Sequence, residues 1–139
     1  MKKVLFVLLL AFTLQLTAQE SSTWLTDYKV ALKQSETQNK PILAFVTNNQ
    51  SSEALKTLNE QVFETESFKN TLAPKVILLK LDISDKHSYN VRLGIHYTKQ
   101  TTAPGLALVD KFNDTIGQPL VVITPENIKT FLTSVHEKL

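Results

Sequence analysis

The chain has 139 residues, with 15 basic side chains, 13 acidic ones and no cysteine. Without a thiol it cannot form a disulfide or carry out thiol–disulfide exchange. The excess of basic residues comes from Lys2 and Lys3, and beyond them the chain is balanced at 13 basic and 13 acidic residues. A neutral chain offers no electrostatic footprint for nucleic acid, so we expect no nucleic-acid partner.

The first residues have the three parts of a secretory signal peptide. The basic pair Lys2-Lys3 precedes an apolar run from Val4 to Leu16, and the small residue Ala18 follows. The alternative is an uncleaved membrane anchor, but the run is shorter than the roughly 20 residues that a helix needs to cross a bilayer. We therefore predict a signal peptide over residues 1–18 and a mature domain over residues 19–139. The mature domain has no membrane span, and its expected location is periplasmic or secreted.

The mature chain alternates between helical and strand patterns. Its helices are predicted by apolar residues at i, i+3 and i+4 spacing, and its strands by short apolar runs. In chain order, we expect a helix over residues 26–38, a strand over 42–46, a helix capped by Ser51 or Ser52 and extending to Phe63, a short helical piece holding Phe68 and Leu72, a strand over 76–81, a weaker helix over 87–94, strands over 106–109 and 120–123, and a last helix capped by Thr124. This order predicts one α/β domain, in which helices cover both faces of a mixed four-stranded sheet.

A series of short motifs follows one another along the chain. In order, these are Trp24, the helix over residues 26–38, Lys40-Pro41-Ile42-Leu43, Val62-Phe63, Leu81-Asp82, and Ala103-Pro104 followed by Leu106 to Asp110. The series resembles the thioredoxin-like superfamily, in particular its exported bacterial domains. The resemblance covers nearly the whole mature chain and implies a thioredoxin-like fold.

The redox motif of that family, Cys-x-x-Cys, lies where the first strand's loop enters the following helix. Counting forward from Pro41 and back from Phe63 places the two cysteine positions at Ser52 and Leu55. A serine hydroxyl cannot replace the thiolate that attacks a disulfide. The resemblance therefore implies a thioredoxin-like domain that has lost its redox activity.

Nucleophilic catalysis and metal binding have weaker sequence patterns. Ser52 could act as a nucleophile only with a base in hydrogen-bond reach, and the sequence places none of the histidines near it (His87, His96 and His136). We therefore expect Ser51 and Ser52 to cap the helix instead. Asp82, Asp85 and His87 are too few for a defined metal site, so the sequence predicts neither a metal nor a cofactor.

The resemblance also implies that Ala103–Pro104 is the family's cis-proline bond, beside the former redox site. In the family this bond leaves the backbone of the preceding residue free to pair with an extended peptide. Here the segment from His96 to Ala103 is longer than usual, and we expect it to be a polar loop that carries Tyr97. Trp24, at the mouth of the first helix, is expected to be a packing anchor.

The sequence leaves more than one function open. The favoured hypothesis is a redox-inactive binding module of the cell envelope that holds a polypeptide or another envelope protein. Its expected binding face consists of Asn48, Asn49, Gln50, Ser51, Ser52, Tyr97, Ala103 and Pro104. The alternatives are a non-redox enzyme that binds a small anionic ligand at the helix N-terminus around Ser52, and a structural remnant without a site. The identity of a partner and the oligomeric state do not follow from the sequence.

Overall fold

The computed structural model describes residues 23–139, and the predicted signal peptide over residues 1–18 lies outside the described residues. The elements are α2 (Tyr28–Gln38), β1 (Ile42–Thr47), α3 (Glu53–Leu58), the π-helical turns η1 (Asn59–Phe63) and η2 (Phe68–Leu72), the 3₁₀ turn η3 (Ala73–Lys75), β2 (Ile77–Asp82), α4 (Tyr89–Thr98), β3 (Gly105–Val109), β4 (Thr115–Leu120) and α5 (Pro125–Lys138). No helix among these residues is long and apolar enough to cross a membrane.

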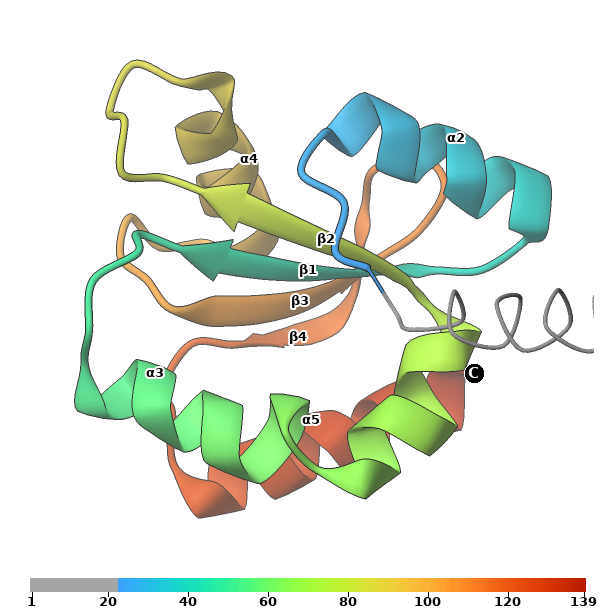
Figure 1. The fold of residues 1–139 in the computed structure, drawn as a ribbon. Helices are drawn as coiled ribbons and strands as arrows, with labels where there is room; N and C mark the ends of the chain where they lie inside the picture. Colours follow the sequence, from blue (N-terminus) through green and yellow to red (C-terminus); the bar gives the residue numbers. More distant parts are fainter. Residues whose placement is uncertain (1–22) are drawn as a thin grey trace, which may run out of the picture.

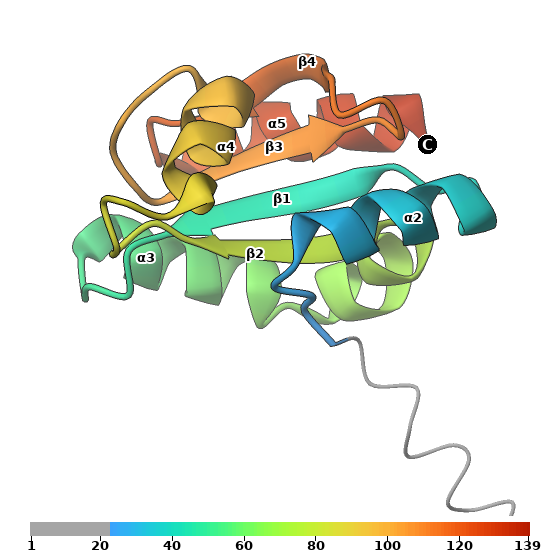
Figure 2. The same cartoon turned by 90° about the horizontal axis from the view of Figure 1, so that it is seen from above.

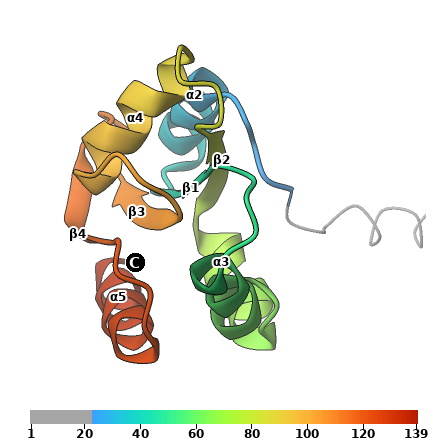
Figure 3. The same cartoon turned by 90° about the vertical axis from the view of Figure 1, so that its left-hand side faces the viewer.

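The strands form one mixed sheet in the order β2-β1-β3-β4. Strand β1 runs parallel to β2 and antiparallel to β3, and β3 pairs antiparallel with β4. Helices α2 and α4 lie over one face of this sheet, while α3 and α5 lie over the other (Figures 1 and 3). The sequence-based prediction of a four-stranded mixed sheet covered on both faces is therefore confirmed.

Two hydrophobic cores lie on opposite faces of the sheet, and β1 contributes to both. All six residues of β1 are buried. Since successive side chains of a strand point to opposite faces, Ile42 and Val46 pack beneath α2 and α4, while Leu43 and Phe45 pack against the layer of α3 and α5. The view from above shows α2 and α4 over the central strands (Figure 2). The predicted strand over residues 42–46 is confirmed.

The segment before α2 closes one edge of the sheet. The Leu25 amide donates to the Leu78 carbonyl at 2.8 Å, and the Lys80 amide donates to the Leu25 carbonyl at 2.7 Å. The neighbouring Trp24 ring lies 5.8, 5.3 and 6.5 Å from the ring centroids of three phenylalanines (Phe45, Phe63 and Phe68). Trp24 is thus a packing anchor, as expected from the sequence.

The last strand lies earlier than the apolar pattern predicts. Strand β4 covers Thr115–Leu120, not residues 120–123. The turn before it is closed by Asp110, whose carboxylate accepts the amides of Phe112 and Asp114, so pairing resumes at once with Thr115 opposite Val109. Of the apolar residues after β4, Ile123 precedes the N-cap Thr124 and packs in the same core as Ile128 of α5.

Helix α4 is longer than its sequence suggests. It begins at Tyr89 and continues through Gly94 to Thr98, where Lys99 takes a left-handed conformation. A Cβ at Gly94 would lie only 3.2 Å from Val46 Cγ1. Because glycine has no Cβ, the helix can continue through this position while it packs closely on β1. The expectation of a helix that ends at residue 94 and a long loop from His96 onward is therefore wrong.

We predict that Trp24→Ala lowers the free energy of unfolding by about 3 kcal/mol, because it removes the centre of the aromatic cluster. The exposed residue Val122 provides a control, since Val122→Ala should change the stability by less than about 0.5 kcal/mol. Urea denaturation followed by circular dichroism measures both values. Equal stabilities of the two variants would contradict the anchoring role of Trp24.

Candidate functional site

Three loops meet at one edge of the sheet. In the strand register, Thr47 at the end of β1 lies opposite Asp82 at the end of β2, and Val46 lies opposite Gly105 at the start of β3. The loops that follow β1 and β2 and the segment that precedes β3 therefore extend from the same edge. The Asn49 side-chain amide joins two of these loops by donating to the Asp82 carboxylate at 2.6 Å.

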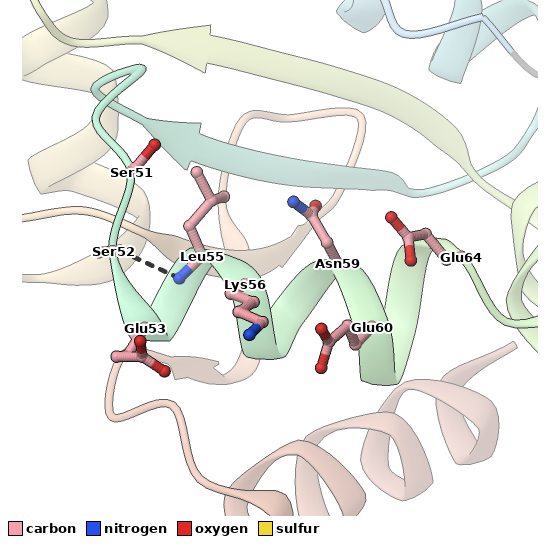
Figure 4. A pocket seen from close by; sticks show the side chains of 8 residues that line it. All are labelled: Ser51, Ser52, Glu53, Leu55, Lys56, Asn59, Glu60 and Glu64. Atoms are coloured by element: carbon pink, nitrogen blue, oxygen red, sulfur yellow. Dashed lines mark hydrogen bonds between the residues drawn. The ribbon is translucent and has the colours of Figure 1, made fainter.

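Ser52 is the N-cap of α3. Its hydroxyl accepts a hydrogen bond from the Leu55 amide at 3.1 Å, and its carbonyl accepts the Lys56 amide at 3.0 Å (Figure 4). The acidic residue Glu53 follows in the first turn, where it offsets the positive end of the helix dipole. Of the two serines named from the sequence, Ser52 is the cap and Ser51 is exposed beside it.

A groove of about 500 Å³ runs along the exposed side of α3 and η1 from this cap. Its lining residues, whose side chains are drawn in Figure 4, are Ser51, Ser52, Glu53, Leu55, Lys56, Asn59, Glu60 and Glu64. Three glutamates and one lysine give the groove an acidic lining. Sequence analysis did not single out Lys56, Glu60 and Glu64, although their spacing of four residues places them on one side of a helix.

The groove offers no partner for nucleophilic catalysis at Ser52. No histidine lines it, and the His96 ring nitrogen Nε2 lies 2.8 Å from the carbonyl oxygen of Asn113, in the turn between β3 and β4. The Ser52 hydroxyl already accepts the Leu55 amide. A serine without a neighbouring base is a weak nucleophile, so the arrangement supports the capping role.

The loop after β2 uses its carboxylates to hold its own backbone. Asp82 accepts the Ser84 amide at 2.9 Å as well as the Ser84 hydroxyl, and Asp85 accepts the His87 amide at 2.9 Å. The hydrogen bonds from Ser84, followed by the one from Asn49, lower the pKa of Asp82 below its ordinary value. Within residues 23–139, no three side chains of metal-ligating type lie close enough together to hold a metal ion.

The segment before β3 completes the edge. The Ala103–Pro104 bond is cis, as the resemblance implies. Thr101 and Thr102 are exposed and Ala103 is half-buried, whereas Pro104 is buried. No hydrogen bond joins the backbone of Ala103 to another residue of the described chain. The accessible part of this segment is therefore the stretch from residue 100 to residue 103.

Tyr97 does not belong to this surface. It lies in the last turn of α4, is fully buried, and donates its hydroxyl hydrogen bond to the side-chain oxygen of Asn113. Burial, with smaller contributions from Tyr28 and Tyr89, raises the pKa of Tyr97 to about 12, so the hydroxyl keeps its proton at neutral pH. The sequence-based placement of Tyr97 on an exposed binding loop is wrong, because α4 continues for another turn.

Comparison with known proteins agrees with this fold. The family described as thioredoxin-like matches residues 23–111, and the chain belongs to this family. A solved structure titled "DsbH Oxidoreductase" superposes with a TM-score of 0.65 at 19% sequence identity, covering 84% of this chain and 85% of that chain. No curated protein matches the sequence. The class is thus a thioredoxin-like domain without cysteines.

We predict that Ser52→Ala lowers the free energy of unfolding by about 1 kcal/mol, because the Leu55 amide loses its side-chain acceptor. The neighbouring Ser51→Ala is the matched control and should stay within about 0.5 kcal/mol of the original chain. Urea unfolding followed by Trp24 fluorescence measures both. If both substitutions lower the free energy of unfolding by the same amount, Ser52 is not the cap.

A second prediction tests whether Ser52 and Leu55 stand where the family's cysteines stand. The double variant Ser52→Cys/Leu55→Cys should form an internal disulfide under mild oxidation and lose both of its titratable thiols. Leu55 is half-buried against the core, so its replacement lowers the free energy of unfolding by about 1–3 kcal/mol. The single variant Ser52→Cys is the control and should keep its thiol. Two thiols that stay reactive in the double variant would show that the positions differ.

Proposed function

We propose that this chain is an exported, redox-inactive thioredoxin-like module that binds an extended polypeptide or a protein partner of the cell envelope. Its signal peptide is removed after Ala18, and the mature domain acts in the periplasm or after secretion. The binding face consists of the loop Asn48–Ser52 and the segment Gln100–Ala103.

One observation carries this proposal. Hydrogen-bonding groups of the binding face have no partner within the described chain, and they lie at an edge of the sheet that is fixed by the pairing of β1 with its neighbours. The backbone of Ala103 has no partner in the described chain, and the side chains of Gln50, Ser51 and Thr102 are exposed. An extended peptide is recognised mainly through its main-chain hydrogen bonds, with neighbouring side chains adding specificity. The face therefore suits a polypeptide better than a small molecule.

The alternative, an enzyme that binds a small anion around Ser52, has no observation in its favour. Helix α3 is only six residues long before the helix widens into η1, so it has a weak dipole. Glu53 already lies at its positive end, and the groove beyond it has an acidic lining. These charges oppose an anionic ligand.

An array of 15-residue peptides with varied sequence, probed with residues 19–139, tests the proposal. We predict that at least one peptide class binds, and that Ser51→Arg/Thr102→Arg weakens its binding by roughly tenfold, because two long side chains then cover the binding face. Both positions are exposed, so the fold should tolerate the change.

Thr133→Arg provides the matched control. Thr133 is an exposed residue on α5, outside the binding face, and arginine is favourable in helices. This variant should bind as the original chain does. An array without any bound peptide, or equal binding by the face variant and the control, would argue against the proposed function.

A further inference from the structure

The position of the segment Gln100–Ala103 depends on the last turn of α4. Within the described chain, the side-chain and backbone hydrogen bonds of residues 100–103 are local: the Gln100 side-chain amide donates to the Thr102 carbonyl at 3.3 Å, and the Thr98 hydroxyl lies 3.4 Å from the Gln100 carbonyl. The segment is therefore held mainly by its two ends, which are Lys99 and Pro104.

The helical turn that leads to Lys99 is packed closely on β3. Thr98 is buried, and its methyl carbon Cγ2 lies 3.0 Å from the place that a Cβ of Gly105 would occupy. Its hydroxyl donates to the Gly94 carbonyl at 2.6 Å within the helix. A glycine at the start of β3 therefore lets the helix end approach the strand, and any rotation of this turn moves the beginning of the binding segment.

The same helical turn is also tied to the other end of β3. The Tyr97 ring is buried in the same core as Ala107 and Val109 of β3, and its hydroxyl donates to the Asn113 side chain. The ring nitrogen of His96 lies 2.8 Å from the Asn113 carbonyl oxygen. Two consecutive residues of α4 thus contact one residue of the β3–β4 turn.

Asn113 is well suited to this contact. It has a positive φ of 68°, a conformation that asparagine tolerates better than most residues. Its amide donates to the Asp110 carbonyl at 3.1 Å, so the turn itself holds it in place. The hairpin's own backbone therefore holds the acceptor that Tyr97 meets.

We infer that Tyr97 and Asn113 are positioning residues of the binding face: their partly buried hydrogen bond fixes the last turn of α4 on β3 and thereby the segment Gln100–Ala103. The functional part of this inference rests on the proposed peptide binding. The hydrogen bond lies outside the binding face, so its loss alters the presentation of the segment without removing a group that touches the peptide.

Two substitutions remove the hydrogen bond from opposite sides. Tyr97→Phe deletes only the hydroxyl, and Asn113→Gly deletes the acceptor while it accommodates the positive φ. Amide hydrogen exchange followed by NMR should show roughly two- to tenfold faster exchange of the Lys99 amide in either variant, because this amide donates to the Ile95 carbonyl at 2.8 Å in the last turn of α4. The double variant should add little to the single ones, because both remove the same bond.

Ile128→Val, in the core on the other face of the sheet, is the control for a general loss of stability. It should leave the exchange rate of the Lys99 amide, relative to the other amides of the domain, unchanged. Any peptide found with the array should bind the Tyr97 and Asn113 variants more weakly by a similar factor, and the Ile128 variant as the original chain does. Unchanged exchange of the Lys99 amide, or fully additive effects in the double variant, would overturn the inference. An array without bound peptides would refute the proposed function alone, since the exchange measurement needs no peptide.

Discussion

The structure depends on the burial of β1 on both faces of the sheet. All six of its residues are buried, and their alternation supplies one core beneath α2 and α4 and another against α3 and α5. Because the central strand is fixed from two sides, its pairing with β2 and β3 has one register. That register brings the carboxyl end of β1 beside the start of β3, so it also creates the edge from which the binding face extends.

The same constraint explains how the fold persists without cysteines. The two cores and the aromatic cluster around Trp24 hold the layers together by packing alone. At the position expected from the sequence for the family's redox motif, Ser52 caps α3, while the chemistry of a thiolate is absent. The scaffold and its activity are therefore separable, and a function has to be argued from the site and not from the fold.

The acidic groove and the proposed binding face share Ser51 and Ser52 but differ in character. The groove follows one side of α3 and η1, where Lys56, Glu60 and Glu64 point outward. The binding face is neutral and rich in amide and hydroxyl groups, and it presents backbone as well as side chains. A partner that crosses both surfaces would meet hydrogen-bonding groups first and carboxylates beyond them.

The sequence by itself determined the elements whose pattern is local and strong. The apolar run of β1, the cap at Thr124 and the order of motifs were sufficient for the fold class, and the absence of cysteine excluded redox chemistry. Tertiary structure decided the rest. Helix α4 passes Gly94 because the glycine lies against Val46, and β4 is a polar edge strand whose position depends on the turn before it. Such contacts join residues far apart in the chain, so a local pattern does not contain them.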